Sequence, residues 1–153
     1  MFPTLSSLLS HEPVDWQAVL DAVLEEFDCT TGTLHRLHTD SQMLHLAAQR
    51  GIPNELHAVV QVIPVGKGIA GVAAEKREPV ELCNLQQDLG GVARENARKT
   101  QVQGSIAVPV LEGDELCGTL GVGKVIPYDF TDEEKQRLLE IASKLAPYLA
   151  LPQ

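Results

Sequence analysis

In the stretch "CGTLGVGK", Cys117 to Lys124, large and small residues alternate as in a strand, but three of the eight residues are glycine. Leu120 and Val122 are large, whereas Gly121 and Gly123 carry no side chain. Successive side chains of a strand point to opposite faces of its sheet. The stretch therefore predicts a strand with one bulky face and one face stripped of side chains.

The preceding stretch, "GSIAVPVLEG" (residues 104–113), repeats this alternation and should form a hairpin with the first. Its even positions from 106 to 110 are large, and its odd positions are small. Glycine in a strand marks the close approach of another backbone or of a ligand. The stripped face therefore leaves room for a helix or for a small molecule, and the pattern alone does not decide between them. The small positions are Ser105, Ala107, Pro109, Cys117, Thr119, Gly121 and Gly123.

The rest of the chain predicts a single α+β domain over residues 14–149, preceded by an extended segment over residues 1–13. The strands come in hairpins and not in β-α-β units, which favours an antiparallel sheet. Asp15 is a plausible N-cap for the first helix, and Thr131 with Glu134 fits a capping box for the last. The predicted elements are a helix over 14–27, hairpin strands within 30–40 and 41–50, short helices and strands within 51–82, a short helix within 90–100, and a long helix over 130–149.

Composition excludes several classes of protein. The 153 residues carry a net charge of −9, which disfavours binding to nucleic acid or to an anionic membrane surface. No apolar run approaches the length of a membrane span, and the first residues lack the pattern of a signal peptide. The cysteines, Cys29, Cys83 and Cys117, are odd in number and widely spaced. They predict reduced, mostly packed thiols in a cytoplasmic protein.

The stretch "GKGIAG", residues 66–71, matches the dinucleotide-binding pattern G-x-G-x-x-G but lacks the secondary structure that this motif requires. That motif needs a strand before it, a full helix after it and an acidic residue about 20 positions on. Here Pro79 ends the helix early, and the surrounding hairpins contradict a parallel sheet. The remaining alternatives are a structural turn, or a helix N-terminus that meets an anion with help from Lys67.

The histidines do not predict a metal site. His35 and His38 are an odd number of positions apart, so they should face opposite sides of one strand. His45 could lie across the hairpin from His35, but without a nearby carboxylate or thiolate the pair is a weak ligand set. We therefore expect surface histidines with satisfied hydrogen bonds, no metal and no cofactor.

Four stretches of the chain carry a family likeness through their order: "VLEEFDCTTGTLHRLHTDSQMLHLAAQRG" (23–51), "IPVGKGIAGVAAEKREPVEL" (63–82), "GSIAVPVLEGDELCGTLGVGK" (104–124) and "FTDEEKQRLLEIASKLA" (130–146). Together they resemble the GAF family of small-molecule sensory domains. The resemblance implies a central antiparallel sheet with the terminal helices on one face. On the other face it implies a ligand pocket, roofed by the segments between the middle strands. It also implies a homodimer through the terminal helices and an output partner that the sequence does not identify.

Departures from the family's patterns narrow the ligand. Members that bind cyclic nucleotides carry an Asn-Lys…Phe…Asp-Glu signature, and Gly123 stands here where the Asn would be, before Lys124 and Phe130. Bilin-binding members have an attachment Cys that is usually followed by His, a pair absent from this sequence. The resemblance therefore implies neither a cyclic nucleotide nor a bilin.

One branch of the family consists of enzymes, the free methionine-R-sulfoxide reductases. Where those enzymes keep their active cysteines, this chain has Ala70 and the Cys-free stretch 93–105. Where they keep amine-binding carboxylates, it has Ser105, Gly121 and Gly123. These departures predict a sensory domain that binds a small molecule without catalysis. A reductase-like enzyme and a ligand-free dimerisation module remain the alternatives.

The resulting ligand site combines a floor from the late hairpin with polar groups from the roof. The roof segments would supply polar contacts, and Lys67 would attract an anion. No catalytic residue is expected. The predicted ligand-binding residues are Ser105, Ala107, Thr119, Gly121, Gly123, Asn84, Arg94, Asn96 and Lys67.

Overall fold

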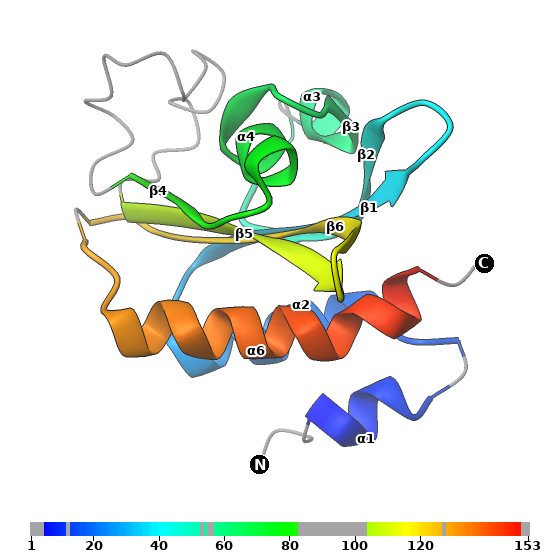
Figure 1. The fold of residues 1–153 in the computed structure, drawn as a ribbon. Helices are drawn as coiled ribbons and strands as arrows, with labels where there is room; N and C mark the ends of the chain where they lie inside the picture. The colour runs from blue at the N-terminus through cyan, green and yellow to red at the C-terminus, as the bar shows by residue number, and fades with distance from the viewer. Residues whose placement is uncertain are drawn as a thin grey trace.

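A six-stranded antiparallel sheet forms the centre of the fold in the computed structural model (Figure 1). The strand order is β3-β2-β1-β6-β5-β4, so β1 and β6, distant in sequence, lie side by side. This arrangement confirms the predicted α+β class. The structure describes residues 5–11, 13–52, 54, 57–82, 104–126 and 128–150. The strands are β1 (Thr31–His38), β2 (Met43–Arg50), β3 (Val62–Pro64), β4 (Val80–Leu82), β5 (Gly104–Glu112) and β6 (Glu115–Lys124).

Helices cover both faces of the sheet (Figure 1). On one face lie the two long helices, α2 (Trp16–Phe27) and α6 (Asp132–Leu149). On the other lie α3 (His57–Gln61) and α4 (Gly68–Lys76). The main core forms between the long helices and the large side chains of the sheet, in which the large positions of β5 and β6 are fully or almost fully buried. None of the described helices is long and apolar enough to cross a bilayer.

Both long helices begin at the residues that the sequence indicates. The Asp15 carboxylate accepts a hydrogen bond from the backbone N–H of Ala18 at 3.1 Å. Thr131 and Glu134 form a complete capping box, with the Glu134 N–H donating to the Thr131 hydroxyl at 3.0 Å. These bonds satisfy N–H groups that a helix start otherwise leaves without partners.

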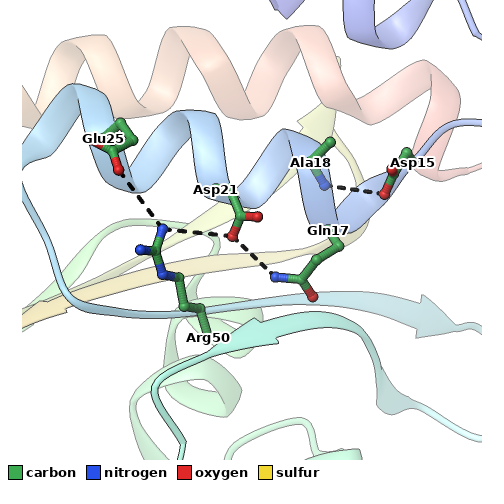
Figure 2. Close-up of polar contacts among 6 residues, drawn as sticks. All are labelled: Asp15, Gln17, Ala18, Asp21, Glu25 and Arg50. Carbon is green, nitrogen blue, oxygen red and sulfur yellow. Dashed lines mark hydrogen bonds and ion pairs between the residues drawn. The ribbon is translucent and has the colours of Figure 1, made fainter. Parts of the chain in front are cut away.

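Arg50 links β2 to the outer side of α2 (Figure 2). Its guanidinium lies 3.8 Å from the Asp21 carboxylate and 4.0 Å from that of Glu25. Gln17 donates to Asp21 at 3.1 Å. The charged side chains are nearly half exposed, so their attraction is screened by water and contributes little to stability. Burial of the apolar side of α2 therefore holds the helix on the sheet.

The N-terminal segment differs from the prediction. We expected residues 1–13 to be extended, but Leu5–Leu9 forms the short helix α1. The reason is the spacing of Leu5, Leu8 and Leu9, which places all three on one helical face. Leu8 and Leu9 are buried in the main core, and Leu5 packs against it. The apolar contacts stabilise a helix that is too short to form alone.

A bulge alters the predicted stripped face of β6. The β5–β6 register shifts between Val110 and Leu111, so alternation fails at this end of the hairpin. Leu116 packs beside Ala74 of α4, whereas Cys117 belongs to the main core on the α2 and α6 side. Cys117 is therefore not part of the stripped face, which was predicted on the assumption of unbroken alternation.

The glycines of β6 serve different purposes. A Cβ on Gly118 would collide with the carbonyl oxygen of His35 and would lie 2.8 Å from Cδ2 of Leu149. Among the described residues, a Cβ on Gly121 would meet nothing nearer than Oγ1 of Thr33, at 3.4 Å. Gly118 is thus required by close packing against β1 and α6. Gly121 leaves space on the other face.

These two positions form a matched pair for mutagenesis. Gly118→Ala should lower the free energy of unfolding by about 2 kcal/mol or more, because backbone and α6 must shift. Gly121→Ala should change it by less than about 0.5 kcal/mol. Urea unfolding followed by circular dichroism measures both. Equal destabilisation by the two substitutions would contradict this assignment.

Candidate functional site

Three strands bring small and polar residues together on the face that carries α3 and α4. Thr33 of β1 pairs with Gly121 of β6, which pairs in turn with Ala107 of β5. Residues directly opposite each other in an antiparallel sheet share a face, so each such row points the same way. We call three adjacent rows the central patch: Thr31, Gly123 and Ser105; Thr33, Gly121 and Ala107; His35, Thr119 and Pro109.

The central patch gathers every floor residue that the sequence predicted. It lies on the face opposite the main core, which receives the alternate residues of the same strands. Thr33, Ser105 and Gly121 are partly exposed, so the middle of the patch is not sealed by the protein. Their role in binding a ligand stays a prediction. The predicted floor residues are Ser105, Ala107, Thr119, Gly121 and Gly123.

The predicted roof and anion residues are less well supported. Asn84, Arg94 and Asn96 lie outside the described residues, as does the helix predicted within 90–100. Lys67 occupies the N-cap position of α4, where its exposed side chain makes no capping hydrogen bond. Its role in attracting an anion stays a prediction.

The glycines of "GKGIAG" have structural uses. Gly66 and Gly68 have φ angles of 95° and 66°, a region that favours glycine. A Cβ on Gly71 would lie 2.6 Å from the carbonyl oxygen of Pro64, and its own carbonyl accepts from the N–H of Gly66 at 2.8 Å. The structure therefore favours the turn over an anion-binding loop.

His35 is the site residue that sequence reasoning missed. We expected a surface histidine with satisfied hydrogen bonds, but its side chain is fully buried. Its Nε2 lies 2.8 Å from the carbonyl oxygen of Val60 in α3. A carbonyl only accepts, so Nε2 carries the hydrogen and Nδ1 of the neutral ring is an acceptor. Within the described part of the chain, this buried Nδ1 has no hydrogen-bond partner.

Thr119 presents a second unsatisfied group beside it. The residue is 1% exposed, lies directly opposite His35 in the sheet and points to the same face. Its Oγ1 is buried and finds no hydrogen-bond partner among the described residues. Buried polar atoms are rarely left in this state. Two such atoms on neighbouring strands mark the buried end of the central patch.

The other histidines show why His35 was misjudged. The partner of His35 across the hairpin is Leu46, not His45. His45 instead stacks on His38, with ring centroids 3.7 Å apart. A bulge between Leu34 and His35 changes the register of this hairpin, which the sequence does not reveal. No group of three potential metal ligands occurs in the described ranges.

The ammonium group of Lys124 already has hydrogen-bond partners within the protein. Its ammonium donates to the carbonyl oxygens of Phe27 at 2.9 Å and Asp28 at 3.1 Å. It also lies 4.6 Å from the ring centroid of Tyr128. A cation at these carbonyls stabilises the C-terminus of α2. Lys124 therefore needs no ligand to explain it.

The two described thiols are poor nucleophiles. Burial raises the pKa of Cys29 to about 11, although the charge of Lys124 partly opposes this. Burial also raises the pKa of the Cys117 thiol. The thiolate is the reactive form, so both should be unreactive at neutral pH. Cys83 lies outside the described residues.

The buried imidazole should make stability depend on pH. Burial lowers the pKa of His35 below 6.5, with a smaller contribution from the charge of His45; the hydrogen bond to Val60 only partly opposes this. The unfolded chain then binds this proton more readily than the folded one. The free energy of unfolding should fall as pH drops below about 6.5 and level off above it.

His35→Gln should remove part of this loss of stability between pH 7 and pH 5. The exposed His38→Gln is the matched control and should keep the wild-type slope. Urea unfolding at several pH values measures the difference. An unchanged slope in His35→Gln would show that His35 does not contribute.

Comparison with known proteins identifies the family. A family model described as GAF domain matches residues 16–149. The chain belongs to the GAF family. One curated relative is the free methionine-R-sulfoxide reductase of Escherichia coli (strain K12), 26% identical over 88 residues, which are 58% of this chain and 51% of the relative. The chain thus matches about half the length of that relative.

Solved structures with the same fold include enzymes and a GAF domain of a larger protein. The free methionine-R-sulfoxide reductase of Neisseria meningitidis, in complex with its substrate, aligns with a TM-score of 0.74 and 21% identity over 95% of this chain and 83% of that one. The GAF domain of a phosphoenolpyruvate-protein phosphotransferase from Coxiella burnetii aligns with a TM-score of 0.76 and 21% identity over 97% and 83%.

These matches correct the functional prediction. We predicted a sensory domain without catalysis and no enzyme. The E. coli relative found by sequence is a reductase, and structures of similar reductases share the fold. The prediction of a non-catalytic sensor is therefore wrong, and the comparisons favour the reductase-like alternative.

Proposed function

We propose that this chain is an enzyme of the free methionine-R-sulfoxide reductase type, which reduces a small methionine sulfoxide bound over the central patch. The observation that carries the proposal is the sequence match to the E. coli reductase. The patch supports it, because a sheet face of glycine, alanine, serine and threonine leaves room for a small molecule.

Reduction of a sulfoxide by a protein needs an accessible thiolate. The thiolate attacks the sulfoxide sulfur, the oxygen passes to the cysteine as a sulfenic acid, and methionine leaves. An external dithiol then forms a mixed disulfide with the sulfenic acid, releasing water, and its second thiol restores the cysteine. The substrate gains two electrons, and the dithiol supplies them.

Cys83 is the thiol that we assign to this step. Cys29 and Cys117 are excluded by burial and by their raised pKa values. Cys83 directly follows Leu82, the last residue of β4, and Leu82 pairs with Ser105 of the central patch. The last described residue before Cys83 therefore lies beside the patch.

A coupled assay tests the assignment. Wild-type protein should reduce free methionine-R-sulfoxide with a dithiol such as thioredoxin, regenerated by NADPH and its reductase. Cys83→Ser should lower the rate at least about 100-fold, because removal of a nucleophile abolishes its step. Cys117→Ser is the matched control and should keep its activity. No turnover by wild type, or full activity of Cys83→Ser, would reject the proposal.

Alkylation offers an independent check on the thiols. In the native protein at pH 7.5, a single cysteine should react readily with iodoacetamide. Peptide mapping should identify it as Cys83. Cys29 and Cys117 should react only after unfolding, since both are buried. Rapid labelling of either buried thiol in the native protein would contradict this distinction.

We also propose a cytoplasmic location, because a thiol enzyme needs a compartment that keeps its cysteines reduced. The homodimer through the terminal helices remains part of the proposal. Light scattering at micromolar concentration tests it directly.

A further inference from the structure

We propose that His35 and Thr119 recognise an uncharged hydrogen-bond donor, an amide N–H or a hydroxyl, on the small molecule that binds over the central patch. This inference rests on the substrate site of the proposed function, but it does not require the thiol chemistry. It predicts that a methionine sulfoxide whose amine is acylated binds more tightly than the free amino acid, because an ammonium group does not fill this role. It assigns a ligand contact to His35, which lies outside the predicted site. It also assigns a hydrogen bond with the ligand to Thr119, which the sequence predicted only as part of the floor.

The geometry supplies two buried atoms that need a partner. Nδ1 of His35 and Oγ1 of Thr119 come from residues directly opposite each other on neighbouring strands, and both point to the face of the patch. Neither atom has a hydrogen-bond partner among the described residues. Buried polar groups without partners are rare, and each requires an explanation. A ligand group that bonds to both supplies one.

The hydrogen bond to Val60 determines that Nδ1 of His35 is an acceptor. Nε2 of His35 donates to that carbonyl at 2.8 Å, which leaves Nδ1 as an acceptor only. The Thr119 hydroxyl can donate or accept. The ligand must therefore present a hydrogen to Nδ1. A carboxylate or a sulfoxide oxygen at this point would meet a lone pair and be repelled.

The surroundings favour a neutral donor over an ammonium group. The central patch contains no charged side chain. The two polar atoms are also shielded from solvent. A cation that loses its water without meeting a carboxylate is strongly disfavoured there. An amide N–H or a hydroxyl loses less hydration and gains the same bond.

The approach to the pair passes over small residues. Ala107 and Gly121 fill the next row of the patch, and Gly121 is partly exposed. Within the described part of the chain, a Cβ at Gly121 would only reach ordinary contact with Thr33 and Ala107, so those residues leave the surface open at this point. A small group can lie on this row with its donor directed toward His35.

Nitrogen-15 NMR of histidine-labelled protein tests the inference directly. The probes are N-acetylmethionine sulfoxide, which carries an amide N–H, and its N-methyl derivative, which does not. The first should move the Nδ1 resonance of His35 upfield in a saturable manner. It should bind roughly three- to tenfold more tightly than the second, as expected for one neutral hydrogen bond.

Variants separate this role from a structural one. His35→Gln can still donate to Val60 through its Nε2, but its one acceptor, Oε1, does not take the position of Nδ1. It should bind the N–H probe roughly three- to tenfold more weakly and lose the preference over the N-methyl probe. Thr119→Val should weaken the N–H probe while the free protein stays folded. His38→Gln, on the exposed histidine, should retain the wild-type preference.

The outcomes distinguish this inference from the proposed function. Turnover of methionine sulfoxide without any Nδ1 shift overturns the inference and leaves the reductase proposal in place. A saturable shift of the Nδ1 resonance without turnover rejects the reductase proposal and supports the inference. If Nδ1 is already hydrogen-bonded in the free protein and neither probe moves it, the pair holds an ordered water only, which also overturns the inference. So does equal affinity of wild type and His35→Gln for the N–H probe.

Discussion

The antiparallel pairing of β1, β6 and β5 is the constraint on which the rest of this structure depends. It aligns three strands so that Leu34, Leu120 and Val108 point to one face and the residues of the central patch to the other. Burial of Leu34, Leu120 and Val108 against the long helices fixes the register, because a slip by one residue would expose all of them. The central patch follows from this register.

On the opposite face of the same strands, His35 and Thr119 lower the stability of the folded protein. An apolar pair at these positions would avoid two unsatisfied buried atoms, each unfavourable by about 1–3 kcal/mol. Stability therefore does not explain them. Local violations of this kind tend to mark functional sites, where the missing partner belongs to a ligand. The patch beside the pair provides the space in which that partner can bind.

The sequence predicts the parts of this fold that depend on local patterns. The caps at Asp15 and Thr131 and the late hairpin could be read from residue type and spacing. The position of His35 could not, because its surroundings come from α3 and β6, far away in the chain. The bulge beside Val110 likewise moves Cys117 off the expected face. The function was mispredicted because the residues at single family positions differ from those of the reductases, whereas the similarity to a reductase is spread over 88 residues.

The central claim is that the small molecule binds on the patch between the sheet and the α3 and α4 layer. Amide NMR spectra during titration with methionine sulfoxide test it most directly. Binding at the patch should produce saturable shifts for the amides of Thr33, Ala107 and Gly121, with little change along α2 and α6. Shifts confined to the long helices, or none at saturating concentration, would contradict it.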